Sequence, residues 1–163
     1  MNRFLSAFAF TKRPPLIGLD ITTSSIKLVE LSLSGGQYRV ESYAAEATPH
    51  SAISEKNIVD ANAVGEVIRR AIKRSGARVS DVAVAISGDA AITKVSQMPR
   101  SLSEQDLETQ VELQADQYIP YPLDEVAIDF EVQGPSDRGP DQVEVLLAAC
   151  RRENVDSRVE VLE

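Results

Sequence analysis

A short polar turn carries the residue types in this chain that are best suited to chemistry. Asp20 ends an apolar run, residues 22–25 (Thr-Thr-Ser-Ser) follow it, and Lys27 lies on the next apolar stretch. A bound phosphate needs backbone N–H groups, hydroxyl donors and a cation, and a carboxylate beside them can hold Mg²⁺ directly or through water. The same pattern also fits an ordinary polar hairpin turn in which Asp20 caps backbone N–H groups, so the spacing alone leaves both interpretations open.

Few other residues are candidates for catalysis or metal binding. The single cysteine, Cys150, closes an apolar run and is interpreted as a core residue. The single histidine, His50, lies in a predicted linker and is interpreted as a surface residue, which leaves no second histidine for a metal site or a triad. Glu30 and Glu41 can face each other across two strands, but nothing marks them as an acid/base pair.

Three predicted strands position the polar turn. Apolar runs and alternation predict strands at 16–21, 26–33 and 38–47. The polar turn joins the first two strands, and Gly35-Gly36 makes the second turn. We therefore expect a three-stranded meander at the start of the fold.

A helix and a fourth strand are predicted to complete the first half. After a linker at 49–57, Asp60 is a suitable N-cap and Gly76 a suitable stop for a helix between them. A strand at 82–86 follows this helix, so we expect it to run parallel to a strand of the meander. The helix carries one apolar stripe, formed by Val64, Val67, Ile68, Ala71 and Ile72.

A second α/β unit is predicted after Gly88. A strand at 92–98 precedes a helix that begins with a capping box at Ser103 and is stopped by prolines at 120 and 122. The acidic residues of this helix are interpreted as a solvated face, favoured by the helix dipole near its start. An exposed edge at 92–97 offers a place for a neighbouring strand to pair.

The remaining elements of this unit are two strands and a helix. Residues 126–132 alternate between apolar and polar side chains, and 143–149 are mostly apolar, so both are predicted strands. Residues 154–163 begin a helix with Val155, Val159 and Leu162 on its apolar face. No stop signal precedes the last residue, so we expect the chain to be part of a longer protein.

Composition excludes several classes of protein. The 163 residues carry 17 Lys and Arg against 25 Asp and Glu, a net charge of −8, which argues against a protein that coats nucleic acid. One cysteine excludes a disulfide framework and fits a reducing cytoplasm. No run approaches the ~18 apolar residues of a membrane-spanning helix. The apolar arm at 1–13 is interpreted as packing on its own domain or staying mobile, with a weak membrane or partner contact as the alternative.

Three segments resemble a known family. Residues 18–31 (GLDITTSSIKLVEL) are similar to the first phosphate motif of actin-like ATPases, D-x-G-[ST]-x-S-x-K. Residues 112–122 (ELQADQYIPYP) and 145–155 (VLLAACRRENV) resemble segments of the PilM family of type IV pilus assembly proteins, which are related to FtsA. The likeness covers the chain from about Leu16 onward. The phosphate motif is shared with sugar kinases and chaperones, whereas the Q-Y-I-P-Y-P stretch is specific.

The resemblance implies a fold and a division into domains. The expected fold is α/β: one half of an actin-like (ribonuclease H-like) ATPase, with a small α/β subdomain inserted as in FtsA. Residues 1–13 would be an N-terminal arm, 14–87 the first actin-like subdomain, and 88–163 the inserted subdomain, cut within its last helix.

The resemblance also implies cofactors and site residues. ATP and Mg²⁺ are the implied ligands, with Asp20 near the metal and Thr22, Thr23, Ser24 and Lys27 near the phosphates. Thr22 stands where the family usually has Gly, so either the turn takes another path or nucleotide binding is weaker, with the Thr22 hydroxyl partly compensating as a donor to phosphate. Since the second half of the ATP cleft would follow Glu163, we expect weak or no ATP binding and no activity in residues 1–163, and at most slow ATPase activity in the full-length protein.

Partners and function follow from the same resemblance. The family implies a cytoplasmic scaffold for pilus biogenesis and twitching motility, held at the inner membrane indirectly by the cytoplasmic peptide of a PilN-like protein, alongside other pilus assembly proteins and without nucleic acid. Tyr118 and Tyr121 are the candidate partner contacts, because tyrosine buries area with few rotamers. The alternatives are an FtsA-like cell-division protein, a sugar-kinase-type enzyme, and an interaction module that has lost nucleotide binding.

Overall fold

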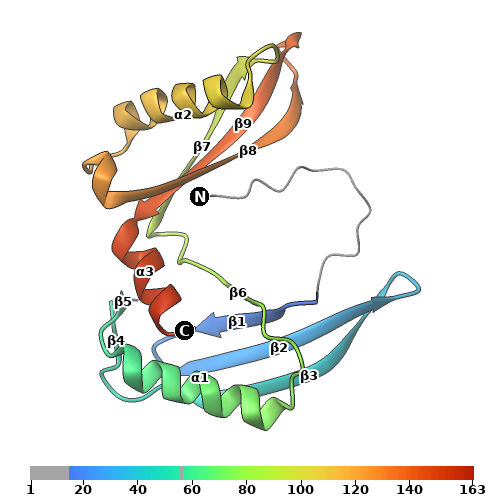
Figure 1. The fold of residues 1–163 in the computed structure, drawn as a ribbon, viewed down its shortest axis with the longest axis vertical. Helices are drawn as coiled ribbons and strands as arrows, with labels where there is room; N and C mark the ends of the chain where they lie inside the picture. Colours follow the sequence, from blue (N-terminus) through green and yellow to red (C-terminus); the bar gives the residue numbers. More distant parts are fainter. Residues whose placement is uncertain (1–14, 56) are drawn as a thin grey trace.

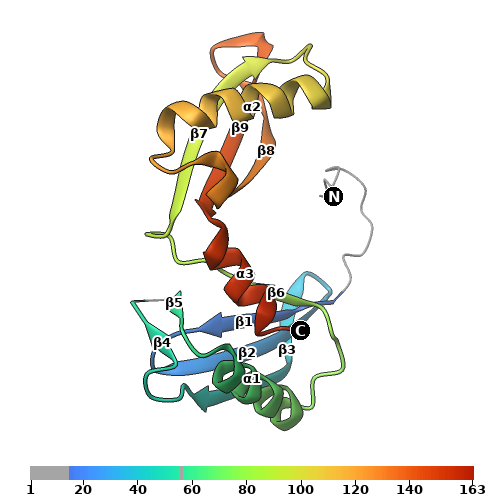
Figure 2. The ribbon, with the colours of Figure 1, turned by 60° about the vertical axis from the view of Figure 1, so that its left-hand side comes forward.

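A computed structural model describes residues 15–55 and 57–163 of the chain. Two β-sheets lie at opposite ends of the molecule, each with one helix on one face, and a third helix runs between them (Figures 1 and 2). The fold is α/β, as predicted. The arm predicted at 1–13 lies outside the described residues.

The first sheet has the strand order β3-β2-β1-β6. Strands β1 (Ile17–Ile21), β2 (Ser25–Ser34) and β3 (Gln37–Ala47) form an antiparallel meander, and β6 (Val82–Val84) lies parallel to β1. The predicted meander and parallel strand are therefore confirmed. The parallel direction follows from the helix that separates β6 from the meander.

Helix α1 (Ala61–Ser75) covers one face of this sheet. Its ends are as predicted: the Asp60 carboxylate accepts a hydrogen bond from the Ala63 N–H at 2.9 Å, and Gly76 closes the helix at φ 69°. The predicted linker before it instead holds a small hairpin of β4 (Ile53–Ser54) and β5 (Asn57–Ile58). The core under α1 contains Ile17, Leu19, Ile26, Leu28, Val64, Val67 and Ile68.

The second sheet has the order β7-β9-β8, all antiparallel. Its strands are β7 (Ala91–Pro99), β8 (Val126–Ser136) and β9 (Gly139–Arg151). Helix α2 (Glu104–Tyr118) covers one face, and Ser103 caps it by accepting from the Asp106 N–H at 3.2 Å. A 3₁₀ turn, η1 (Leu123–Glu125), follows the two prolines and leads into β8. The core under α2 contains Met98, Val111, Ala115, Val126, Val145 and Leu147.

Helix α3 (Arg152–Glu160) differs most from its prediction. The predicted apolar face is confirmed only in part. Leu162 packs against the core under α1, but Val159 is 47% exposed, and the buried residues are Asn154, Arg158 and Val161. Val161 belongs to the core under α1, while the start of α3 lies against β8 and β9. Helix α3 therefore packs on both units. The domain boundary at about residue 87 remains a prediction.

We refer below to β1–β6 with α1 as the first unit and to β7–β9 with α2 as the second unit. None of the helices in residues 15–55 and 57–163 has the length and apolar character needed to cross a bilayer.

Candidate functional site

The predicted phosphate turn is a hairpin loop closed by its own side chain. The Thr22 hydroxyl donates to the Ser25 carbonyl oxygen at 2.8 Å and accepts from the Ser25 N–H at 3.1 Å. Within the described residues, Ser51 and Glu55 are the non-glycine residues with positive φ, so Thr22 takes no left-handed conformation. The turn follows a path that does not need Gly, and the Thr22 hydroxyl is engaged within the loop rather than aimed at a phosphate.

The outer end of the loop keeps two open donors. Thr23 and Ser24 are exposed, and neither backbone N–H donates a hydrogen bond within the part of the chain that the structure describes. Thr48 braces the inner side by donating its hydroxyl to the Thr22 carbonyl oxygen at 2.7 Å. A braced loop with two outward N–H groups is suited to an anion, although it supplies only part of a phosphate site.

Asp20 and Lys27 lie opposite each other on β1 and β2. Asp20 Oδ2 and Lys27 Nζ are 3.1 Å apart, and both side chains are more than half exposed. They border an open groove of about 570 Å³ on the sheet face opposite α1, with Gly18 in its floor. Lys27 is placed to reach an anion in this groove. No group of three His, Cys, Asp or Glu side chains that could hold a metal occurs in residues 15–55 and 57–163. A Mg²⁺ ion at Asp20 would therefore need further ligands from phosphate, water or the rest of the protein.

A cavity of about 300 Å³ lies between the two units. Glu55, Asn57 and Ser87 line it from the first unit and the connection that leaves it, and Ile119 and Tyr121 line it from the segment after α2. The remaining wall comes from the strands of the second sheet and from α3. The cavity therefore mixes an apolar wall with charged groups, which suits a peptide rather than a purely apolar ligand.

Arg158 is the most unusual side chain of this cavity. It is 8% exposed, its Nη1 donates to the Asn154 carbonyl oxygen at 2.8 Å, and its Nε donates to the Ala85 carbonyl oxygen at 3.2 Å. No carboxylate pairs with it among the described residues. Burial lowers the pKa of the guanidinium, which remains a cation at neutral pH. A guanidinium has five N–H donors, so Arg158 keeps donors for a bound carbonyl or carboxylate.

The two candidate partner tyrosines belong to different surfaces. Tyr121 is 43% exposed and lines the cavity, with the Arg151 guanidinium 5.5 Å from its ring centroid. Tyr118 is 48% exposed and lines a separate groove between α2 and β7, with Lys94 Nζ 2.8 Å from its ring centroid. Ile119 between them is a buried core residue. One partner site containing both rings is thus not formed.

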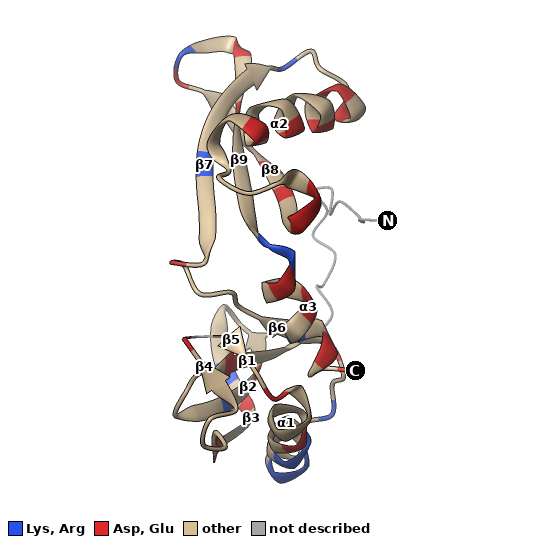
Figure 3. Ribbon diagram, turned by 90° about the vertical axis from the view of Figure 1, so that its left-hand side faces the viewer, with Lys and Arg blue, Asp and Glu red and all other residues tan. Residues whose placement is uncertain are grey.

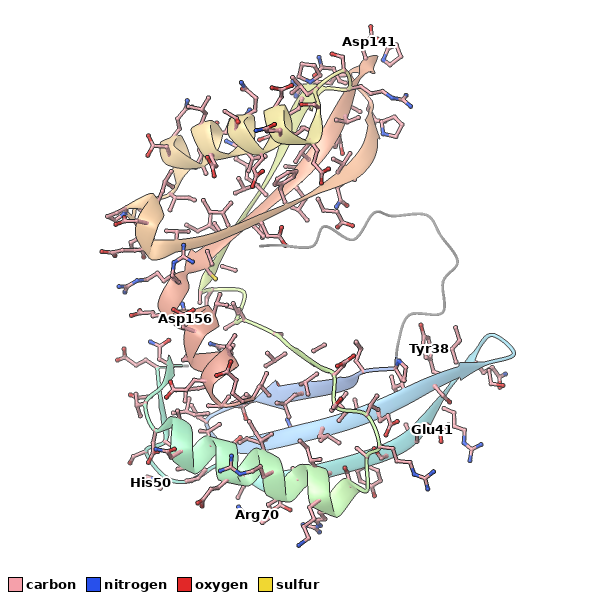
Figure 4. All side chains as sticks on the ribbon, in the orientation of Figure 1. Tyr38, Glu41, His50, Arg70, Asp141 and Asp156 are labelled. Atoms are coloured by element: carbon pink, nitrogen blue, oxygen red, sulfur yellow. The ribbon has the colours of Figure 1, made fainter. Side chains whose placement is uncertain are left out.

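The other candidate residues were Cys150, His50 and the pair Glu30 and Glu41. Cys150 is half-buried in the cavity wall, and burial raises the pKa of its thiol. His50 is exposed, as predicted (Figure 4). Glu41 occupies a β-bulge opposite no residue, and Glu30 accepts a hydrogen bond from Ser42 instead, so the two carboxylates do not pair.

Comparisons with known proteins identify the family. A family model described as the type IV pilus assembly protein PilM matches residues 18–163. The chain belongs to the PilM family. A solved structure described as a PilM–PilN type IV pilus biogenesis complex contains a chain 31% identical to this one, with a TM-score of 0.77 over 90% of this chain and 43% of that chain. The chain thus spans less than half the length of the solved relative.

PilM-family membership places the described sheets within an actin-like α/β fold. The family match is to PilM rather than to FtsA or a sugar kinase. Sequence reasoning singled out Tyr121, which lines the cavity, but missed Arg158 and Asn154, which line it from α3. Asn154 and Arg158 are four residues apart and so lie on one helix face, which was the available signal. The neighbouring valines led the prediction to another face.

Proposed function

We propose that this protein is a cytoplasmic scaffold of type IV pilus assembly that holds the cytoplasmic segment of a PilN-like inner-membrane protein in the cavity between its two units. Family membership and the solved relative in complex with PilN support this role. The observation that carries the site is the cavity itself, with its buried and incompletely bonded Arg158. The PilN-like partner would hold the scaffold at the inner membrane, and the scaffold itself would make no contact with the membrane.

The proposed binding mode follows from the cavity wall. Ile119 and Val126 offer apolar contact, and Tyr121 beside Arg151 offers an aromatic anchor at the rim. The open donors of Arg158 would bond backbone carbonyl oxygens or a carboxylate of the bound segment. Such bonds are strong because the cavity excludes much of the competing water.

Cys150 provides a test of this site. It is the single cysteine of the chain and lies in the cavity wall, so alkylation by iodoacetamide reports on one position. Addition of the PilN-like cytoplasmic peptide should slow alkylation at least tenfold at saturation. Tyr121→Ala should weaken this protection about tenfold, whereas Tyr43→Ala, an exposed tyrosine on β3, should leave it unchanged. Full alkylation at saturating peptide would refute the cavity as the site.

We further propose that the full-length protein binds Mg-ATP at the hairpin loop, with the Thr23 and Ser24 N–H groups and Lys27 on the phosphates. Asp20 would then release Lys27 and bind the metal, and the rest of the protein would supply further metal ligands. Nucleotide-dependent closure around the cavity would change affinity for the partner peptide. The open donors of the loop support this proposal.

The nucleotide proposal has its own test in the full-length protein. Lys27→Ala should weaken Mg-ATP binding about tenfold or more by calorimetry, because it removes the cation nearest the loop. Lys73→Ala, an exposed lysine on α1, should bind as the parent does. Equal affinity of the Lys27→Ala protein would exclude the loop from the nucleotide site.

A further inference from the structure

Strand β7 leaves one side of its backbone unpaired. It runs for nine residues at the edge of the second sheet and pairs with β9 on its other side. Every second residue of an edge strand directs its N–H and C=O outward. Within β7, Lys94 is the charged side chain (Figure 3), and it points toward Tyr118 rather than guarding the edge. The edge is therefore open to another strand.

A groove of about 680 Å³ runs between this edge and α2. Its helical wall is a stripe of glutamines, and no hydrogen bond within the described residues uses their side-chain amides. A primary amide both donates and accepts, so it can bond the backbone of an extended segment. Leu113, 58% exposed, and Val95, 55% exposed, add apolar contacts. The glutamines that line the groove are Gln97, Gln110, Gln114 and Gln117.

The charge of this groove differs from that of the whole chain. Its charged lining residues are Lys94 and Arg138, and none of its lining residues is acidic, although the chain has a net charge of −8. An acidic segment is therefore complementary in charge to this groove.

The opposite edge of the same sheet, formed by β8, is protected against pairing with another strand. Strand β8 carries the exposed carboxylates Asp129 and Glu131, whereas β7 has no acidic residue. Glu108, Glu112 and Asp116 form a stripe along α2 on a different face from the glutamines. An acidic strand would be repelled at β8 and accepted at β7.

We propose that the β7 edge binds an extended acidic segment of a partner protein by strand addition, with its side chains held under the glutamine stripe of α2. This surface is separate from the cavity that contains Tyr121. Binding at the β7 edge and binding in the cavity can therefore be tested independently.

The test uses a fluorescein-labelled decapeptide of alternating valine and glutamate, with a valine–lysine decapeptide as its charge-reversed counterpart. Anisotropy should show binding of the acidic peptide at least tenfold tighter than of the basic one. Backbone amides of β7 should become protected from hydrogen exchange when the acidic peptide binds, whereas those of β8 should not.

Matched variants locate the site. Gln114→Glu places a carboxylate in the groove and should weaken binding of the acidic peptide about tenfold. Gln105→Glu adds the same charge to another face of the same helix and should change it less than twofold. Lys94→Glu should weaken binding more than Gln114→Glu. Equal binding by the Gln114→Glu protein, protection at β8, or self-association of the chain through β7 would overturn the proposal. Tyr121→Ala should leave this peptide's affinity unchanged, which separates the result from the PilN-like site.

Discussion

The two units solve the same packing problem in different ways. In each, one 15-residue helix covers one face of a sheet. Helix α1 buries five residues and is tied to β3 by Arg70 and Arg74, which both pair with Glu46. Helix α2 buries two residues and exposes polar side chains along most of its length. Helix α1 is therefore packed more extensively on its own sheet than α2 is, and α2 leaves more of its surface exposed.

The largest expected effect comes from opening the core of the first unit. Ile26 is 0% exposed, so Ile26→Ala should lower the free energy of unfolding by about 3–4 kcal/mol. Hydrogen exchange followed by mass spectrometry should show faster exchange in β1, β2 and α1 with little change in β7 and α2. Val145→Ala in the second core should show the reverse distribution. Equal acceleration of hydrogen exchange in both units would instead show that the molecule unfolds as one cooperative body.

A smaller effect is expected where α3 enters the first core. Val161→Ala should cost about 2 kcal/mol and should speed exchange in α3 and α1. Val159→Ala is the matched control, since Val159 is 47% exposed and lies on the opposite side of the same helix. If both variants have the same stability, α3 does not contribute to the first core.

The helix caps should give equal losses in the two units. Asp60→Ala and Ser103→Ala each remove the acceptor for one N–H at the start of a helix, which costs about 1 kcal/mol. Thermal unfolding measures both losses. A much larger loss for Ser103→Ala would show that α2, with fewer buried residues, depends on its cap more than α1 does.

The smallest expected effect is a pH dependence confined to the first unit. Hydrogen bonds from Arg74, and then from Arg70, lower the pKa of Glu46 below its ordinary value of about 4.3. Because the folded-state pKa is depressed, this contribution to stability is complete above about pH 4.3 and is lost as pH falls through the folded value. Denaturant unfolding of Glu46→Gln should therefore differ from the parent at pH 6 and converge with it at low pH. Glu66→Gln, which removes an exposed carboxylate of α1, should not show this convergence.

Elements set by local sequence were predictable. The Asp60 and Ser103 caps and the Gly76 stop bound both long helices correctly, because each signal acts within one turn. Alternation and apolar runs located all the long strands, and the helix before β6 determined its parallel direction. These features need no information from distant residues.

Features set by tertiary contacts were missed. The buried face of α3 is polar because Arg158 meets a carbonyl oxygen at Ala85, 73 residues earlier. A pattern that favours apolar residues selects Val155 and Val159 instead. The separation of Tyr118 from Tyr121 depends on where α2 ends over the sheet, which spacing does not reveal.

The bond from Arg158 to Ala85 has a mechanical consequence. The chain leaves the first unit after β6 and returns to it at α3, and this one side chain ties the outgoing connection to the returning helix. The two segments that connect the sheets are therefore held together by a hydrogen bond in addition to the packing of α3 on the first core. Loss of this arginine's hydrogen bond would therefore loosen both connections between the two ends of the protein at once.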